Sequence, residues 1–188
     1  KYLADKIPME EGLKFLYTRG SGILITLYDI ENNNILSNID KYIEFNKLKL
    51  SIGDSFLILN NQYSYSYQKR FKIAEKLSFL ELNDGDLIKN KYLESIKWKL
   101  QPTLVENDKV EVSKIRKFLK IYINYLLQFE SVRLNKRFSN IEEYIIYFNS
   151  MDLTILEKIS QRLYFKNNFI ISIYLIDWFI NKEINKEI

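Results

Sequence analysis

Residues 71–98 read FKIAEKLSFLELNDGDLIKNKYLESIKW and carry the strongest local signal in the chain, two apolar-rich segments on either side of Asp84-Gly85. The Asp-Gly pair is favoured in two-residue hairpin turns, in which both central residues take positive φ. If the segments pair about this turn, Phe71 faces Trp98 and the large apolar side chains fall on one face. The sequence therefore predicts an antiparallel β-hairpin here.

The opposite face of this predicted hairpin gathers basic side chains and no carboxylate. Its members are Arg70, Lys72, Lys76, Lys89, Lys91, Lys97 and Lys99, and upstream the alternation continues through Tyr63, Tyr65 and Tyr67. Cations that contact phosphates and rings that stack on bases are the combination with which proteins hold single-stranded nucleic acid. The basic face of the 69–100 hairpin is therefore a predicted nucleic-acid-binding site. The alternative is that its lysines only prevent edge-to-edge aggregation of an exposed strand.

Turn signals recur through the rest of the first hundred residues. Pro8, followed by two glutamates, favours a short leading helix, and Gly20-Ser21-Gly22 is predicted to end it. Further strands are expected at residues 23–30, 42–50 and 55–59, the last two joined by a turn at Gly53-Asp54. We therefore expect residues 1–101 to form an antiparallel β domain, a small barrel or sandwich with a short leading helix.

Beyond Gln101 the apolar residues recur at steps of three and four, which is the period of an amphipathic helix. Four helices are expected. The first runs from Ser113 to about Arg133, and the second follows a capping box at Ser139 and Glu142. The third follows Asp152, and the fourth runs from Phe169 to about Asn185. Residues 102–188 are therefore predicted to form a helical bundle. The whole chain is predicted to be an α+β protein of two domains.

The chain contains neither histidine nor cysteine. This composition excludes Ser-His and Cys-His nucleophiles, thiolate zinc sites and disulfides. Asp84 and Asp86 are the closest pair of carboxylates, but they lack the ligand spacing of a calcium-binding loop. We therefore assign no catalytic residue, no metal ligand and no cofactor, and we expect a protein that is not an enzyme.

The composition is that of a globular protein, with 47% hydrophobic residues, 15% aromatic residues and a formal net charge of +4. The most apolar stretch, residues 169–180, is interrupted by Asp177 and falls short of the roughly 20 residues that span a bilayer. No transmembrane segment and no signal peptide are predicted, which favours a soluble intracellular protein. Because the chain starts at Lys1, we expect it to be processed or trimmed.

Two functional hypotheses follow. The first is a non-enzymatic interaction module that docks to a protein partner within a larger assembly, because 14 tyrosines, 12 phenylalanines and 2 tryptophans are many for a small core and aromatic side chains are enriched at interfaces. The codon usage of an AT-rich genome also favours Tyr and Phe. The second hypothesis is single-strand binding by the basic hairpin face. The two differ in whether the tyrosines are exposed beside the lysines or buried with Phe71.

Overall fold

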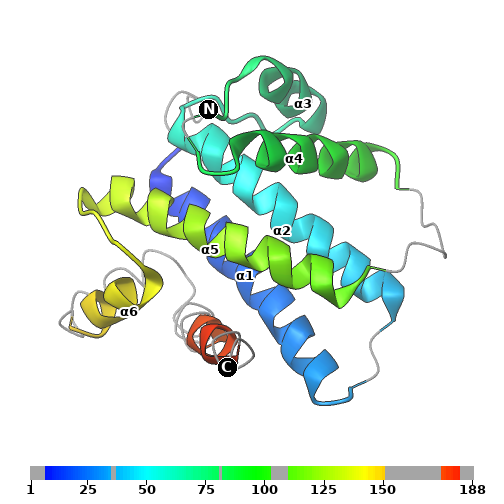
Figure 1. The fold of residues 1–188 in the computed structure, drawn as a ribbon. Coiled ribbons are helices and arrows are strands. Elements are labelled where there is room, and N and C mark those ends of the chain that lie inside the picture. Colours follow the sequence, from blue (N-terminus) through cyan, green and yellow to red (C-terminus); the bar gives the residue numbers. More distant parts are fainter. Residues whose placement is uncertain (1–6, 35–36, 81, 103–109, 151–174, 183–188) are drawn as a thin grey trace.

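The computed structural model describes residues 7–34, 37–80, 82–102, 110–150 and 175–182, and all regular structure within these ranges is helical (Figure 1). The helices are α1 (Met9–Glu31), α2 (Asn38–Leu59), α3 (Tyr67–Lys76), α4 (Gly85–Leu100), α5 (Val112–Leu134) and α6 (Ile141–Asn149), followed by a helical segment at 175–182. No described residue forms a strand. The predicted α+β class and its N-terminal β domain are therefore wrong, and the protein is all-helical over the described residues.

Helices α1 and α2 form a long antiparallel pair, and α5 crosses this pair (Figure 1). Helix α4 packs on α2, α3 packs on α4, and α6 contacts α5. The segment 175–182 lies against the end of α1, where Trp178 packs edge-on against Tyr28 with ring centroids 5.3 Å apart. Residues of the predicted domains 1–101 and 102–188 thus share contacts, because α5 touches both α1 and α2. The boundary near residue 101 stays a prediction.

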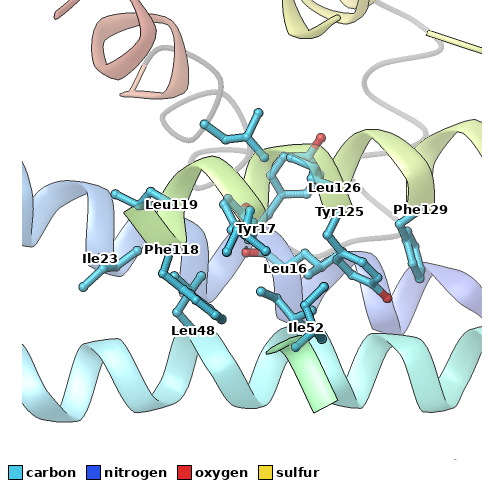
Figure 2. Packing of buried hydrophobic residues seen from close by; sticks show 14 of the residues in the cluster. Leu16, Tyr17, Ile23, Leu48, Ile52, Phe118, Leu119, Tyr125, Leu126 and Phe129 are labelled. Carbon is cyan, nitrogen blue, oxygen red and sulfur yellow. Dashed lines mark hydrogen bonds between the residues drawn. The ribbon is translucent and has the colours of Figure 1, made fainter. Parts of the chain in front are cut away.

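The core lies where α1, α2 and α5 meet (Figure 2). Its members include Leu16, Ile23, Leu48, Ile52, Phe118, Leu119, Leu126 and Phe129, none more than 5% exposed. Full burial of each such side chain stabilises the fold by about 1.5–3 kcal/mol relative to leaving it in water. In helix α2 every residue from Leu48 to Ile58 is buried.

Helix α1 continues through the glycines that were predicted to end it, so the expected strand at 23–30 is wrong. The apolar period carries on across them, with Leu16, Ile23 and Leu27 all fully buried on one face. A Cβ atom at Gly20 would come within 2.1 Å of the Tyr122 hydroxyl of α5. Close helix packing therefore explains a glycine whose intrinsic cost in a helix is about 1 kcal/mol.

Helix α2 replaces the two strands expected at 42–50 and 55–59, and Gly53-Asp54 lies inside this helix rather than in a turn. The helix begins where the Ser37 side chain accepts a hydrogen bond from the Asp40 backbone N–H, at 3.1 Å. Because neighbouring helices cover α2 on several sides, its apolar residues form a continuous run instead of a stripe. A run of this kind is also typical of a buried strand.

The predicted hairpin is a pair of helices. Helices α3 and α4 run side by side, and the Nζ of Lys97 lies 5.5 Å from the centre of the Phe71 ring, so the two segments do meet. Asp84 takes positive φ, at 58°, but it does so as the residue that precedes α4. The strand pairing and the basic sheet face that depended on it are therefore wrong.

The helix expected from residue 113 to about 133 is confirmed as α5. The helix expected after residue 139 is α6, with its cap shifted by one position: the Asn140 side chain accepts from the Glu143 N–H, and the Glu143 carboxylate accepts from the Ser139 N–H, both at 2.8 Å. The helix expected after Asp152 lies outside the described residues. Of the last expected helix, residues 175–182 are described and are helical.

Candidate functional site

The predicted site residues are spread over one connection and two helices. Tyr63 and Tyr65 lie between α2 and α3; Tyr67, Arg70, Lys72 and Lys76 lie on α3; Lys89, Lys91, Lys97 and Lys99 lie on α4. The Lys89 ammonium donates hydrogen bonds to the carbonyl oxygens of Glu75 and Leu77, at 2.9 and 3.0 Å, and so caps the C-terminus of α3. Lys91 pairs with Glu94 at 2.8 Å. Lys72 and Lys76 are exposed.

Four of the predicted residues line one hollow, which we call the tyrosine pocket. Its volume is about 370 Å³, within the size range of small-molecule sites. The pocket is lined by Phe15, Arg19, Ile43, Lys47, Leu50, Ser51, Asp54, Tyr63, Tyr67, Arg70, Trp98 and Lys99. Helices α1, α2, α3 and α4 thus all contribute to it.

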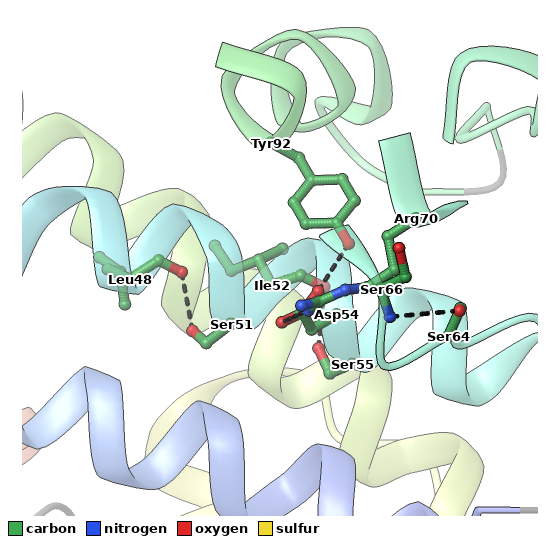
Figure 3. A network of polar contacts seen from close by, with 9 residues as sticks. All are labelled: Leu48, Ser51, Ile52, Asp54, Ser55, Ser64, Ser66, Arg70 and Tyr92. Atoms are coloured by element: carbon green, nitrogen blue, oxygen red, sulfur yellow. Dashed lines mark hydrogen bonds and ion pairs between the residues drawn. The ribbon is translucent and has the colours of Figure 1, made fainter. Parts of the chain in front are cut away.

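A buried polar network forms the base of the tyrosine pocket (Figure 3). Arg70 of α3 reaches to α2 and donates to one carboxylate oxygen of Asp54. The other carboxylate oxygen accepts a hydrogen bond from the Tyr92 hydroxyl of α4, at 2.6 Å. Arg70 is only 3% exposed and Asp54 only 8%. This network therefore joins three helices beneath the site.

Opposing effects set the charges in this network. Burial raises the pKa of Asp54 above its ordinary value, while Arg70 and the Tyr92 hydrogen bond act in the opposite direction. Burial lowers the pKa of Arg70, but the carboxylate of Asp54 outweighs this and leaves it above its ordinary value. Burial and the nearby Asp54 charge raise the pKa of Tyr63 to about 12. The guanidinium and the neutral phenol therefore persist at ordinary pH.

Arg70 also positions two of the tyrosines. Its guanidinium carbon lies 3.9 Å from the centre of the Tyr67 ring and 5.0 Å from that of Tyr63, which is the geometry of cation–π attraction. Tyr65 packs edge-on against Tyr63, with ring centroids 5.8 Å apart, and is 76% exposed. The tyrosines are therefore neither all buried nor all exposed: two are half-buried against Arg70 and one projects into solvent.

Cations surround the opening of the tyrosine pocket. Arg19 and Lys99 are exposed, and neither forms an ion pair with another described residue. Lys47 pairs with Glu44 at 2.5 Å. Among the lining residues the only carboxylate is Asp54, which is already neutralised by Arg70. The pocket therefore presents net positive charge beside aromatic rings.

Sequence reasoning missed several members of this site, namely Phe15, Arg19, Lys47, Asp54 and Trp98. A helical period would have grouped some of them, because Phe15 and Arg19 are four residues apart and Lys47, Ser51 and Asp54 follow at steps of four and three. The contact between these faces of α1 and α2 depends on tertiary packing, and no local sequence pattern predicts it.

No protein-family model, curated protein or solved structure matches this chain. Among the described helices, none combines the length and the apolar character needed to cross a membrane. The described residues also contain no cluster of three or more acidic side chains suited to a metal ion. The site is therefore interpreted from its own chemistry.

Proposed function

We propose that the protein is a non-enzymatic module that binds single-stranded nucleic acid at the tyrosine pocket. The observation that carries this proposal is the arrangement of unpaired cations and tyrosine rings around one hollow whose single carboxylate is neutralised. A base stacked on an aromatic ring contributes about 1–3 kcal/mol, and this contribution depends little on sequence. Phosphates on either side of such a base would lie near the cations at the opening.

Each part of the pocket has a distinct role in this proposal. Tyr65 lies beside the pocket, where it packs against the lining residue Tyr63, and its exposed ring supplies the stacking surface. The Arg19 and Lys99 side chains contact the phosphates. Arg70 is a positioning residue, because it is buried and holds Tyr63 and Tyr67 by its guanidinium. The net charge of +4 is too small to attract nucleic acid by itself, so the local grouping matters more than the total.

Docking to a protein partner remains the other hypothesis. Its support is the content of aromatic residues in the sequence. The exposed large apolar side chains among the described residues are distributed over several helices. Examples are Ile25 on α1, Ile39 on α2, Val132 on α5 and Ile146 on α6. These side chains identify no particular docking surface, whereas the cations and aromatic rings of the tyrosine pocket line one hollow. The tyrosine pocket therefore favours nucleic acid as the first ligand to test.

Removal of the two unpaired cations tests the phosphate contacts. With a fluorescein-labelled 12-nucleotide DNA strand, the logarithm of affinity is expected to fall with the logarithm of salt concentration by about 0.7 for each phosphate contact. The Arg19→Ala/Lys99→Ala variant is expected to reduce this slope by about 1.4, because two contacts are lost. Fluorescence anisotropy between 20 and 200 mM salt, roughly the range over which counterion release is measurable, gives both slopes.

Lys72→Ala/Lys76→Ala is the matched control for that experiment. It also removes two positive charges, from exposed positions on α3, and neither lysine lines the pocket. Its slope is expected to equal that of the wild type. An equal reduction in both variants would mean that the strand binds through overall charge, and no binding of the wild type at low salt would return the preference to a protein partner.

Tyr65→Ala tests the stacking contribution separately from charge. We expect this variant to bind the same strand about 5- to 150-fold more weakly, the equivalent of about 1–3 kcal/mol, with its salt slope unchanged. Because Tyr65 is 76% exposed, the thermal unfolding temperature is expected to stay near that of the wild type. Tyr65→Phe should retain most of the affinity. A loss in the phenylalanine variant as large as that in the alanine variant would contradict stacking as the cause.

A further inference from the structure

A second hollow lies on another side of α2, where α2, α4 and the start of α5 come together. Its volume is about 650 Å³, and its walls include the rings of Phe45 and Phe118. Four lysines also line it: Lys49, Lys91, Lys114 and Lys117. We call this hollow the Lys49 pocket. It shares no lining residue with the tyrosine pocket.

Lys49 is unusual among these lysines because it is buried and has no counter-ion among the described residues. It is 8% exposed, and its Nζ lies 4.1 Å from the centre of the Phe45 ring. No hydrogen bond or ion pair joins it to any other described residue. A buried ammonium is normally paired, because removing a charge from water is costly unless a partner compensates. Here the aromatic ring is its one described partner.

The described carboxylates near the Lys49 pocket form ion pairs with other lysines. Glu94 on α4 pairs with Lys91 at 2.8 Å, and Glu111 before α5 pairs with Lys114 at 3.3 Å; both glutamates are more than half exposed. Burial lowers the pKa of Lys49 to about 8, with Glu94 raising it and Lys91 lowering it by smaller amounts. Lys49 is therefore mostly protonated at neutral pH, and no described residue forms an ion pair with it.

We infer that the Lys49 pocket binds an amphiphilic anion, a ligand with an apolar body and a carboxylate head group that pairs with Lys49. The apolar body would contact Phe45 and Phe118, while the head group would supply the counter-ion that no described residue provides. An inorganic anion would satisfy the charge but leave the apolar walls uncovered, and a neutral apolar molecule would leave the ammonium unpaired. This inference is independent of nucleic-acid binding.

Decanoate, decan-1-ol and acetate are suitable probes, because they separate the charge from the apolar body. In isothermal titration calorimetry at pH 7, we expect decanoate to bind at least about 10-fold more tightly than either of the others. Lys49→Met keeps the apolar stem and removes the charge. It is expected to weaken decanoate binding about 10-fold or more and to leave decan-1-ol binding unchanged.

The control variant is Lys47→Met, which makes the same change two residues away on α2, at a lysine that lines the tyrosine pocket instead. Its decanoate affinity is expected to equal that of the wild type. Circular dichroism would verify that both variants fold, and Lys49→Met is expected to fold well because it removes a desolvated charge. Equal losses in the two variants would overturn the assignment of the ligand to this pocket.

The dependence of binding on pH gives an additional measurement. Because the carboxylate pairs with the protonated amine, affinity for decanoate is expected to be highest near neutral pH and to fall as the pH rises through about 8. It should also fall in acid, where the carboxylate of the ligand becomes protonated. Among the described residues, the other charged groups around the pocket are Lys91 and Glu94 on α4 and Lys114, Lys117 and Glu111 at the start of α5. In the Lys49→Met variant, the affinity for decanoate should no longer decrease at alkaline pH. Equal binding of decanoate and decan-1-ol, or no binding of decanoate at all, would overturn the inference.

Discussion

Replacement of Arg70 by methionine is expected to lower the free energy of unfolding by about 3–5 kcal/mol at pH 7. Methionine fills much of the same volume, but it leaves the Asp54 carboxylate buried with the Tyr92 hydroxyl as its remaining partner. A buried charge that has lost its partner is among the costliest defects in a protein. Urea denaturation followed by circular dichroism would measure the change.

The cost of Arg70→Met is expected to shrink as the pH is lowered. Burial already raises the pKa of Asp54 in the folded protein, and loss of the guanidinium raises it further, whereas the unfolded chain has the ordinary value of 3.8. Between these two values the folded variant binds more protons than the unfolded one, so its stability rises as the pH falls through the folded pKa. The variant should therefore lose less stability at pH 4.5 than at pH 7.

Two further variants isolate the charge effect. Lys69→Met is the neighbouring substitution on the exposed side of α3, and it is expected to change stability by no more than about 0.5 kcal/mol. The double variant Asp54→Asn/Arg70→Met removes both charges and is expected to be more stable than Arg70→Met alone. A loss that is the same at both pH values and is not relieved in the double variant would mean that packing, not the unpaired carboxylate, is responsible.

The sequence predicted helix α5 because the helix is buried on one side only. Its core residues, among them Ile115, Leu119, Tyr122 and Leu126, recur at steps of three and four and form a clear stripe. Helix α2 gave no such stripe, since its middle is buried on several sides. The glycines inside α1 and α2 then resembled turns, although Gly20 fits against Tyr122 of α5 and Gly53 against Tyr92 of α4. The low helix propensity of these glycines is outweighed by packing between helices, which a single sequence does not reveal.

The error over residues 71–98 has a simpler origin in the spacing of α4. Its buried residues Ile88, Tyr92 and Ile96 are separated by steps of four, and a step of four fits both the period of two in a strand and the period of 3.6 in a helix. The Asp84-Gly85 pair, which is favoured in hairpin turns, then led to the prediction of a β-hairpin. The same turn chemistry, with positive φ at Asp84, also serves to begin a helix.

The candidate site could be predicted only in part. The grouping of Tyr63, Tyr67, Arg70 and Lys99 followed from a strand alternation that does not exist. These residues line one pocket for a different reason, the packing of α4 on α2 and of α3 on α4. Arg19 lies about fifty residues from the tyrosines in sequence and had no local connection to them. The buried carboxylate of Asp54 resembled a turn residue because it follows a glycine.

Substitution of Gly53 by alanine is expected to destabilise the protein by about 3 kcal/mol, although alanine is the better helix former. A Cβ atom at this position would lie 2.1 Å from two carbons of the Tyr92 ring. That ring has no room to retreat, because it is fully buried and its hydroxyl is bound to Asp54. The substitution should therefore disturb the network under the tyrosine pocket, and chemical denaturation would measure the loss.

Gly22→Ala is the matched control, because Gly22 is also inside a helix but has a flexible neighbour. There a new Cβ atom would meet the carboxylate end of Glu44, at 2.7 Å, and this end can move aside. Gly22→Ala is therefore expected to raise the free energy of unfolding by up to about 1 kcal/mol, the ordinary gain from replacing glycine in a helix. A smaller side chain at position 92 should make room for the new Cβ atom at position 53. The double variant Gly53→Ala/Tyr92→Leu should therefore regain part of the stability lost in Gly53→Ala. If both alanine variants were stabilised, the close approach of Tyr92 to α2 would be disproved.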